Sequence, residues 1–309
     1  MPSVSVIIPA YNSVRTIART IDSVIAQSFH DFEIVVVDDG SNDGTPEAVA
    51  RYGSRITLIR QNRGGPSAAR NAGARVAKGK YFAFLDSDDC WMPSMLARCM
   101  GALAANPHCV LVYSDLLTVD SEGRAAGVEL VNTPTAHAPS LDELLQRMWP
   151  IYPCATVMRS DAFHGAGGFC EALSGCEDIH FWVVMRKQGE FLYLSEKLAR
   201  YTYDTYPAIL KALRRDEAGG AAKFNAVMRS DFGDSAEGLI AYFAKHKVSL
   251  LSRIGLLAMR HGDRRAARRS FMRAIAWDPY RVKTYLRLMR TFLPTSVAAR
   301  LSGHASHPT

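Results

Sequence analysis

The chain has 309 residues, of which 48% are hydrophobic and 22% charged, a composition typical of a soluble globular protein with a sizeable core. At this length we expect one large domain with an appendage rather than two equal domains. No apolar run approaches the ~20 residues of a membrane span, and the N-terminus has neither a basic segment nor a cleavage site, so we expect a cytoplasmic protein. The six cysteines form no CxxC pair, which argues against a zinc site and against a disulfide framework.

Charge is distributed unevenly along the chain. The whole sequence carries 37 Lys and Arg against 30 Asp and Glu, a net charge of +7. Residues 241–309 contain 14 of the basic residues and, as acids, only Asp263 and Asp278, which leaves 23 basic and 28 acidic residues in the first 240. The body of the protein is therefore mildly acidic and its C-terminal segment strongly basic.

Short apolar runs alternate with helical patterns in the first third of the chain. Strands are predicted at Val4–Pro9, Glu33–Val37, Ile56–Ile59 and Tyr81–Leu85. Helices are predicted at Val14–Gln27, from Pro46 onward, and at Pro66–Ala77. Repeated alternation of strand and helix indicates a parallel sheet with helices on both faces, an architecture that binds nucleotides at the carboxyl ends of its strands.

Polar loops follow the first two predicted strands. Tyr11, beside the turn at Pro9, can offer an aromatic face to a base, and Asp39 can accept a hydrogen bond from a pyrimidine N3–H. Most of the second loop, Asp38–Thr45, also has a simpler interpretation, in which its glycines form turns and Thr45 caps a helix. Asp38 and Asp39 are less easily explained in that way.

The third loop leads into a helix with an unusually small face, in the sequence QNRGGPSAARNAGA at Gln61–Ala74. The alanines permit close packing, while the guanidinium of Arg70 can reach a diphosphate. A solvated helix arginine is the alternative interpretation.

The fourth predicted strand ends in three carboxylates, in the sequence YFAFLDSDD. Crowded carboxylates repel one another unless a cation lies between them, and a bend at Ser87 could turn Asp86 and Asp88 toward one divalent ion. An acidic turn after a strand is the alternative.

Four segments together resemble a known family: VSVIIPAYN, VDDGSNDGT, QNRGGPSAARNAGA and FLDSDD, in this order and at this spacing, resemble the family 2 glycosyltransferases of the GT-A fold. The resemblance implies an α/β protein with a single Rossmann-like, doubly wound mixed sheet flanked by helices, followed here by a C-terminal helical extension. It also implies a nucleotide-diphosphate-sugar donor, which we expect to be a UDP-sugar.

The same resemblance assigns roles to individual residues. Pro9, Tyr11 and Asp39 would hold the nucleoside, and Arg70 would lie near the base or the diphosphate. Asp86 and Asp88 would form the DxD motif that binds Mn²⁺ or Mg²⁺ together with the donor diphosphate, whose leaving charge the cation offsets. Asp89 is expected to support the turn from behind.

A second acidic pair, Glu177 and Asp178, follows the Gly-rich segment Gly165–Gly175 and begins a helix that extends through Met185. It resembles the ED motif of the family, in which the aspartate deprotonates the acceptor hydroxyl. This implies that Asp178 is the general base, supported by Glu177, and that displacement is direct and inverts the anomeric configuration. Favourable placement of acids at a helix N-terminus is the alternative interpretation.

The second half of the predicted catalytic region would face the acceptor, a saccharide or a lipid-linked sugar. Val110–Leu117 is predicted to form another strand, and Gly165–Gly175 could be a mobile loop that closes over the donor. Three aromatic residues, Trp149, Tyr152 and Trp182, either form a sugar-stacking surface or belong to the core. His180 is expected to be structural rather than catalytic.

The sequence departs from the family after Leu198. The Arg-x-His element of many members is missing, and Arg200 might replace part of it. No QxxRW motif is present, so transfer of a single sugar is expected. We expect a catalytic domain over residues 1–205, with a nucleotide-sugar-binding half at 1–115 and an acceptor-binding half at 116–205, and a basic helical extension over 206–309.

From about Ser235 the pattern becomes helical and basic, and Gly262–Pro279 resembles one tetratricopeptide-like hairpin. The arginines could attract an anionic membrane or an acidic partner, or could form a solvated face. Nucleic-acid binding is not expected, because no reading motif is present.

A catalytically silent nucleotide-sugar-binding or scaffold protein is the alternative function. A nicotinamide dehydrogenase is disfavoured, since no GxGxxG follows the first predicted strand.

Overall fold

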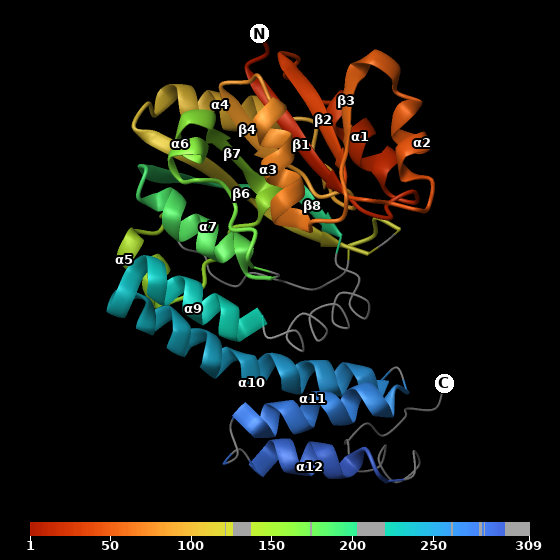
Figure 1. Cartoon of the computed structure of the whole chain (residues 1–309), viewed down its shortest axis with the longest axis vertical. Coiled ribbons are helices and arrows are strands. Elements are labelled where there is room, and N and C mark those ends of the chain that lie inside the picture. Colours follow the sequence, from red (N-terminus) through yellow and green to blue (C-terminus); the bar gives the residue numbers. More distant parts are fainter. Residues whose placement is uncertain are drawn as a thin grey trace.

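One sheet of eight strands runs through the described part of the chain (Figure 1). The computed structural model describes residues 1–120, 122–125, 137–173, 175–202, 220–260, 262–277, 280 and 282–293, and only the backbone at 245–250, 253, 257, 260 and 277. The strands are β1 (Val4–Ala10), β2 (Phe32–Asp38), β3 (Ile56–Arg60), β4 (Tyr81–Phe84), β5 (Cys90–Trp91), β6 (Cys109–Val119), β7 (Thr156–Arg159) and β8 (Glu190–Thr202). The helices are α1 (Ile17–Ile25), α2 (Thr45–Ala50), α3 (Pro66–Val76), α4 (Met95–Ala105), α5 (Leu141–Gln146), α6 (Ser160–Gly165), α7 (Glu177–Arg186), α9 (Gly220–Phe232), α10 (Glu237–Arg260), α11 (Arg264–Trp277) and α12 (Val282–Arg290).

The strand order is β3-β2-β1-β4-β7-β6-β8-β5. β1 pairs in parallel with β2 and β4, and β2 pairs in parallel with β3, as the alternation in the sequence predicts. β7 is antiparallel to β4 and β6, and β5 is antiparallel to β8, so the sheet as a whole is mixed. The predicted α/β fold is thus confirmed, and the carboxyl ends of β1, β2, β3 and β4 meet at one edge.

Apolar side chains cover both faces of this sheet. One cluster contains Ile8 of β1 with side chains of α1 and α4, and the other contains Ile7 with side chains of α6 and α7. Successive residues of a strand point to opposite faces of the sheet, and both faces are covered here. β1 is therefore buried along its whole length. A continuous apolar run in the sequence therefore becomes a central strand, and its polar neighbours are placed at the sheet edge.

The first helix starts later than its apolar spacing predicts. We expected it from Val14, but α1 begins at Ile17. The backbone N–H of Ser13 donates to Oγ1 of Thr45 at 2.8 Å, and that of Val14 donates to Oδ2 of Asp43 at 3.1 Å. Residues 13 and 14 are therefore bonded to the loop after β2, and Val14 remains 40% exposed.

Gly73 lies where α3 packs against β1 and β2. A Cβ at this position would be 2.4 Å from Cγ2 of Ile7 and 3.2 Å from Cγ2 of Val37. Gly73→Ala should therefore lower the free energy of unfolding by ~1–3 kcal/mol in a denaturant titration, because side chains of two central strands would have to shift. The control is Gly101→Ala in α4, where an added Cβ meets nothing within 4 Å and should be neutral or stabilising. Equal losses in the two variants would contradict this packing.

Helical structure in the C-terminal region begins earlier than predicted. We expected it from about Ser235, whereas α9 starts at Gly220. Phe224 and Met228 of α9 are buried in the same cluster as Leu239 of α10 and Trp182 of α7. α9 and the start of α10 thus pack against helices of the sheet region. The run of small residues at the start of α9 gives a weak periodic signal, which explains the missed helix.

The second half of α10 forms a separate core with α11 and α12. Gly255 of α10 faces the ring of Phe271 in α11 so closely that an added Cβ would be 2.5 Å from a ring carbon. Ala258 and Ala267 join Phe271 in one buried cluster. α10 and α11 form a close helical hairpin, whereas the segment Gly262–Pro279, which we likened to a hairpin, contributes only the single helix α11 among its described residues.

Candidate functional site

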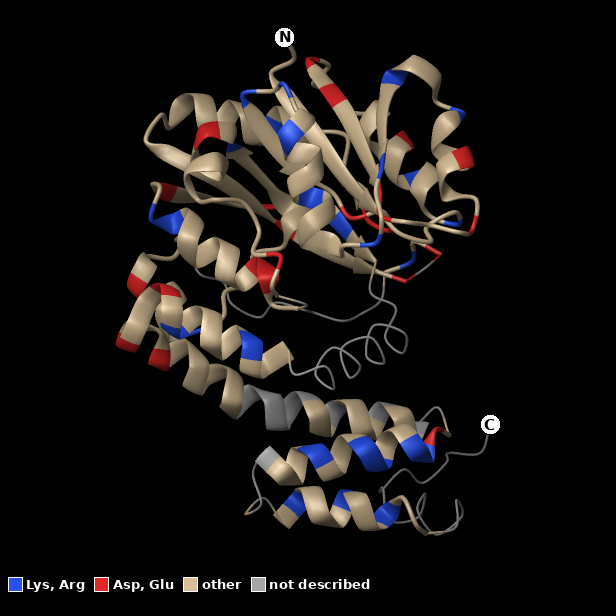
Figure 2. Cartoon of the chain, in the orientation of Figure 1, with Lys and Arg blue, Asp and Glu red and all other residues tan. Residues whose placement is uncertain are grey.

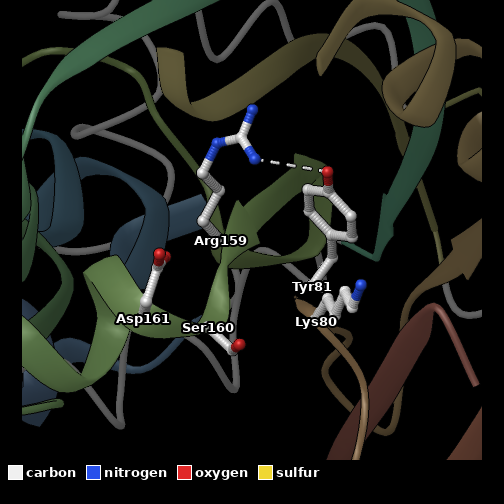
Figure 3. Close-up of a pocket in the computed structure, with 5 residues that line it drawn as sticks. All are labelled: Lys80, Tyr81, Arg159, Ser160 and Asp161. Carbon is white, nitrogen blue, oxygen red and sulfur yellow. Dashed lines mark hydrogen bonds between the residues drawn. The ribbon is translucent and has the colours of Figure 1, made fainter. Parts of the chain in front are cut away.

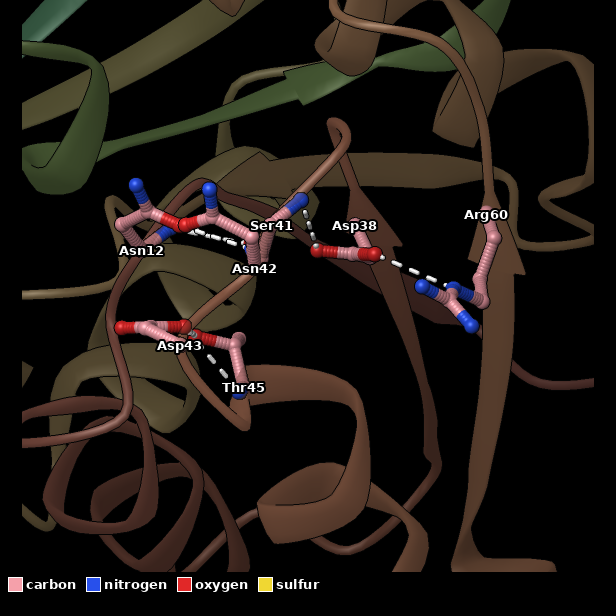
Figure 4. Close-up of polar contacts among 7 residues, drawn as sticks. All are labelled: Asn12, Asp38, Ser41, Asn42, Asp43, Thr45 and Arg60. Atoms are coloured by element: carbon pink, nitrogen blue, oxygen red, sulfur yellow. Dashed lines mark hydrogen bonds and ion pairs between the residues drawn. The ribbon is translucent and has the colours of Figure 1, made fainter.

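The loops after β1 and β2 are bonded to each other at the carboxyl edge of the sheet (Figure 4). The N–H of Asn12 donates to Oγ of Ser41 at 2.9 Å, and the N–H of Asn42 donates to Oδ1 of Asn12 at 3.0 Å. Thr45 is not the helix cap that we predicted, since Gly44 holds that position and the Thr45 hydroxyl bridges Asp43 and the N–H of Ser13. The capping residue has a left-handed φ of 85°, a conformation that glycine adopts more easily than other residues, which explains why Gly44 occupies this position.

Asp38 braces the second loop from inside the protein. Its side chain is fully buried, Oδ1 accepts a hydrogen bond from the N–H of Ser41 at 3.1 Å, and Oδ2 accepts one from Nε of Arg60 at 3.2 Å (Figure 4). Both carboxylate oxygens are therefore used within the fold. Asp38 positions the loop and does not face a ligand.

Asp39 connects the loop after β2 to the loop after β3. Its Oδ1 accepts hydrogen bonds from Nε2 of Gln61 and the N–H of Gly64, each at 2.7 Å, and its Oδ2 accepts one from the N–H of Gly65 at 2.8 Å. The side chain is 4% exposed. Two oxygens offer about four acceptor positions, so one remains for a further donor.

Tyr11 lies at the tip of the first loop, beneath an arginine that the sequence analysis did not single out. The guanidinium carbon of Arg63 is 4.0 Å from the centre of the Tyr11 ring, and Tyr11 as a whole residue is 37% exposed. The bonds of Asp39 to Gly64 and Gly65 place Arg63 there. Pro9, by contrast, is buried within β1, so it can act on this loop only by directing the end of the strand.

The three carboxylates after β4 differ in exposure. Asp86 is partly exposed, Asp88 is exposed, and Asp89 is buried. Asp89 lies behind the turn, as expected: its N–H donates to the carbonyl of Asp86, and its Oδ1 accepts from the N–H of Thr202 at 2.7 Å. The Asp88 carbonyl accepts from Nη2 of Arg19 and from the Thr202 hydroxyl. α1 and the end of β8 therefore hold the backbone of this turn.

These carboxylates are suited to a hard divalent cation. Burial, followed by the charges of Asp88 and Asp86, raises the pKa of Asp89 well above its usual value. The three groups therefore repel one another, and a cation beside Asp86 and Asp88 would relieve that repulsion. Carboxylate oxygens are the ligands that Mg²⁺ and Mn²⁺ prefer.

Arg70 joins the two acidic motifs, which are far apart in the sequence. Its Nη2 lies 2.7 Å from Oδ1 of Asp86, and its Nη1 lies 3.4 Å from Oε1 of Glu177. The side chain is buried, and its guanidinium also lies 5.1 Å from the ring centre of Phe169. The two carboxylates hold the pKa of Arg70 above its usual value despite burial, so the group is a permanent cation at the centre of the site.

Asp178 lies beside this cation, at the start of α7. Gly175 and Cys176, with φ values of 131° and 59°, turn the chain into the helix, and Oδ1 of Asp178 accepts from the N–H of Ile179 at 2.9 Å. Burial, and then the charge of Glu177, raises the pKa of Asp178 to about 6, against an opposing effect of Arg70. A partly exposed carboxylate with such a pKa is suited to accept a proton near neutral pH.

The Gly-rich segment before α7 is fastened to α3. Asn71 accepts from the N–H of Phe169 at 2.9 Å, and its Nδ2 donates to the carbonyl of Phe169 at 2.8 Å and to Glu171 at 2.9 Å. Gly168 packs against the Asn71 side chain, with a φ of 75°. Asn71 thus fastens the described part of this segment to α3, and the closure of the segment over a donor stays a prediction.

Burial decides between the two interpretations of the aromatic residues. Trp149 is 4% exposed and Trp182 is 1% exposed, with Nε1 of Trp182 donating to the carbonyl of Ile151, so neither offers a surface on which a sugar could stack. Tyr152 is partly buried against Tyr201, with ring centres 5.3 Å apart. Two of the three aromatic residues are therefore core residues.

His180 lies on α7, and Arg200 lies on β8. Nε2 of His180 lies 2.8 Å from Oδ2 of Asp231, an interaction that connects α7 to α9. Arg200 is exposed on β8, opposite Cys90 of β5, and thus close to the turn that contains Asp88. The pairing of β8 with β5 brings the backbone of Arg200 close to the acidic turn, and its replacement of the missing element stays a prediction.

Two other polar features lie at the opposite edge of the sheet. A hollow of about 300 Å³ is lined by Lys80, Tyr81, Arg159, Ser160 and Asp161, at the amino end of β4 (Figure 3). Among the described residues, His108, Cys109 and Glu190 place one possible metal-binding atom each within 4.8 Å of one another, where β6 and β8 begin. Neither feature includes a residue of the acidic motifs.

Within the described residues, no helix combines the length and the hydropathy that crossing a bilayer requires.

Comparison with known proteins finds one matching family and several relatives. Residues 5–164 match the family described as "Glycosyl transferase family 2". The succinoglycan biosynthesis protein ExoO of Rhizobium meliloti is 38% identical over 148 residues, which cover 46% of this chain and 42% of that protein. The alignments span only 27%, 58% and 31% of the length of three curated relatives that are 31–33% identical.

Two solved structures have a similar fold. The S. aureus TarS 1–349 structure in complex with UDP has a TM-score of 0.55 and 19% identity, covering 100% of this chain and 94% of that one. The mannosyltransferase PcManGT of Pyrobaculum calidifontis, in complex with GDP-Man and Mn²⁺, has a TM-score of 0.60 and 18% identity, covering 97% and 86%. The TM-scores establish a shared fold, and at identities this low they establish nothing more.

Proposed function

Because the chain belongs to glycosyltransferase family 2, we propose that it moves one sugar from a nucleotide-diphosphate-sugar to a hydroxyl of a saccharide or lipid-linked acceptor, with inversion at the anomeric carbon. The observation that carries this proposal is the position of Arg70 between Asp86 and Glu177. It supports a site in which Asp86, of the proposed DxD motif, and Glu177, the neighbour of the proposed base Asp178, share one cation. The residues proposed to stabilise the leaving diphosphate and the residue proposed to deprotonate the acceptor would then belong to one site.

The donor is proposed to be a UDP-sugar. Tyr11 and Arg63 would contact the base, and the remaining acceptor position of Asp39 would bind a pyrimidine N3–H. Pro9 would set the direction of the loop. TarS has been solved with UDP and with UDP-GlcNAc, whereas PcManGT has been solved with GDP-Man, so a fold of this kind accommodates either nucleotide.

Asp86 and Asp88 are proposed to hold Mn²⁺ or Mg²⁺, which, when bound, would neutralise charge on the departing diphosphate. Arg70 contributes a second, fixed positive charge and orients Asp86. Glu177 keeps Arg70 in place and, through its own charge, helps to raise the pKa of Asp178. Asp178 then accepts the proton of the acceptor hydroxyl as that oxygen attacks the anomeric carbon.

The acceptor is proposed to belong to a polysaccharide under synthesis, since the relative ExoO is named a succinoglycan biosynthesis protein. We propose that residues 1–205 form the catalytic domain, with the acceptor bound by 116–205, and that the basic extension at 206–309 brings the enzyme to an anionic membrane surface. Eight Lys and Arg against one acid among the described residues of 262–293 support that association.

A donor screen tests the proposal directly. UDP-sugars with Mn²⁺ should raise the unfolding temperature in a thermal-shift assay, since a ligand at a hundred times its Kd adds ~2.7 kcal/mol of stability. The bound sugar should then be transferred to oligosaccharide acceptors, and NMR of the product should show an inverted anomeric centre. Stronger stabilisation by GDP-sugars would overturn the choice of UDP. Donor binding without turnover on any acceptor would favour the silent-scaffold alternative.

The pH dependence of transfer should follow the ionisation of Asp178. A general base acts only when deprotonated, and the pKa of Asp178 is raised to about 6. kcat/KM should therefore be flat above neutrality and fall about tenfold per pH unit below pH ~6. Because Glu177 interacts with Asp178, the apparent value belongs to the pair. A profile that stays flat down to pH ~4 would contradict the assignment.

A further inference from the structure

The outward side of α12 carries large apolar side chains that are exposed in the described structure. Exposed fractions range from 41% at Tyr285 to 68% at Val282. Residues three and four apart share one face of a helix, so these side chains form a continuous stripe. We call this set the α12 outer face, and it comprises Val282, Tyr285, Leu286 and Met289 of the helix together with Phe292 in the turn that follows it, whose ring lies 4.0 Å from the guanidinium carbon of Arg268. A continuous apolar surface of this kind usually marks an interaction site.

The opposite side of α12 is packed against α11, which fixes the direction in which the outer face points. Thr284 and Thr291 are fully buried, and Leu288 packs against the cluster that contains Phe271. Arg268 of α11 donates to the Thr291 carbonyl at 3.1 Å. The exposed stripe is therefore not a core face that a small rotation of the helix would bury.

Basic residues are concentrated on α11 and α12 (Figure 2). Lys283 and Arg287 lie beside it on α12, and further arginines lie on α11: Arg264, Arg265, Arg268, Arg269 and Arg273. The single acid among the described residues of 262–293 is Asp263, whose Oδ1 accepts from the N–H of Ala266 at the start of α11. The outer face is thus an apolar strip bordered by positive charge.

This combination favours one kind of occupant. A second copy of the chain would bring the arginines and lysines of two α12 helices together, and like charges oppose that contact. Nucleic acid would take the arginines and leave the apolar strip exposed to water. An anionic bilayer matches both parts, since apolar and aromatic side chains enter the interface while Lys and Arg contact the headgroups.

We propose that the α12 outer face inserts into the interfacial region of an anionic membrane while the basic residues of α11 and α12 bind lipid phosphate. This inference rests on the proposed function, because membrane binding would serve to bring the proposed transferase site to a lipid-linked acceptor. The extension lies on the same side of the sheet as the carboxyl ends of β1 and β4 (Figure 1), so docking through α12 leaves the acidic motifs on the membrane-facing side of the sheet.

Vesicle flotation with the full chain tests the proposal. The protein should float with vesicles of equal parts phosphatidylcholine and phosphatidylglycerol, should remain at the bottom with phosphatidylcholine alone, and should be released by high salt. Leu286→Gln combined with Met289→Gln should weaken binding at least tenfold, because two exposed apolar groups no longer enter the interface. Lys283→Gln combined with Arg287→Gln should weaken it about thirtyfold.

A matched control lies at the far end of the sheet region. Val76 is 43% exposed and its neighbours Arg75 and Lys78 are exposed. Val76→Gln with Lys78→Gln removes one apolar side chain and one charge outside the proposed surface, and should leave flotation unchanged. Equal loss in this control and in the α12 variants would overturn the assignment of the surface. Absence of flotation with anionic vesicles would also overturn it. A dimer detected by light scattering that dissociates in the α12 variants would do the same, because the surface would then bind a second copy of the chain.

The test separates this inference from the proposed function. Flotation requires neither donor nor turnover, whereas stabilisation by UDP-sugars requires no lipid. The Leu286→Gln and Met289→Gln variant should keep the donor response of the parent. A protein that responds to donors but ignores anionic vesicles would disprove the membrane surface and leave the transferase proposal standing.

Discussion

Asp178→Asn should reduce the rate of sugar transfer by about 10²–10⁴-fold, which is the rate enhancement that a general base typically contributes. Donor binding should stay within about twofold of the parent. Asparagine keeps the shape of the side chain and its interaction at the start of α7 but cannot accept the acceptor proton at neutral pH. Initial rates with a UDP-sugar, measured beside Mn²⁺-dependent nucleotide binding, check both halves of the expectation.

Stability distinguishes a base from a structural carboxylate. Because the folded-state pKa of Asp178 is about 6 and its ordinary value is 3.8, the folded protein binds more protons than the unfolded chain between these values. Stability contributed by this group therefore falls as pH rises through that window, and its ionised form is unfavourable at neutral pH. At neutral pH, the unfolding temperature of the asparagine variant should therefore equal or exceed that of the parent.

Asp161→Asn is the matched control for this substitution. Asp161 also lies in the first turn of a helix, and its Oδ1 also accepts from the next backbone N–H, at 2.7 Å, but it lies at the opposite edge of the sheet. Full activity in Asp161→Asn and loss in Asp178→Asn would support the base. An active Asp178→Asn enzyme would remove Asp178 from that role.

Asp88→Ala should abolish metal-dependent donor binding, with Kd for UDP in Mn²⁺ weakened by at least about a hundredfold. The carboxylate is exposed, and the hydrogen bonds from Arg19 and Thr202 go to its backbone carbonyl, so the turn should survive the change. Isothermal titration of UDP with and without Mn²⁺ measures the effect. Removing one of the charges that raise the pKa of Asp89 should leave the unfolding temperature equal or higher.

Asp142→Ala, at an exposed position in the first turn of α5, controls for loss of negative charge and should bind UDP like the parent. Binding of equal strength with and without the metal in the parent protein would refute the DxD assignment. If Asp88→Ala bound UDP normally but remained inactive, the carboxylate would act in catalysis without holding the cation.

Local sequence patterns predicted the sheet and the edge at which the site lies. Apolar runs such as Tyr81–Leu85 can be satisfied only as buried strands, and polar residues that follow such strands must emerge at the same edge. The start of α7 at Glu177 was predicted for a similar reason, because glycines before it and an apolar pattern after it are local signals. The place of Asp89 behind its turn was implied by the family resemblance, and the bond that holds it there joins residues 113 positions apart.

Contacts between distant segments could not be predicted in this way. Asp38 and Asp39 have the same side chain and adjacent positions, yet one braces its own loop and the other holds the loop after β3. Trp149 and Trp182 fit either a sugar surface or a core until packing buried them. α9 was missed because its burial comes from α7 and α10, not from its own weak periodicity.

Neighbouring residues in the chain predict a parallel sheet with acidic motifs at one edge, because secondary structure and the chemistry at strand ends depend on local sequence. The position of Arg70 between Asp86 and Glu177, and the outward direction of the apolar stripe of α12, are visible only in the folded molecule. Burial and ion pairing depend on which helices and strands pack together, so Arg70 and Glu177, which are 107 positions apart, meet only after that packing is complete.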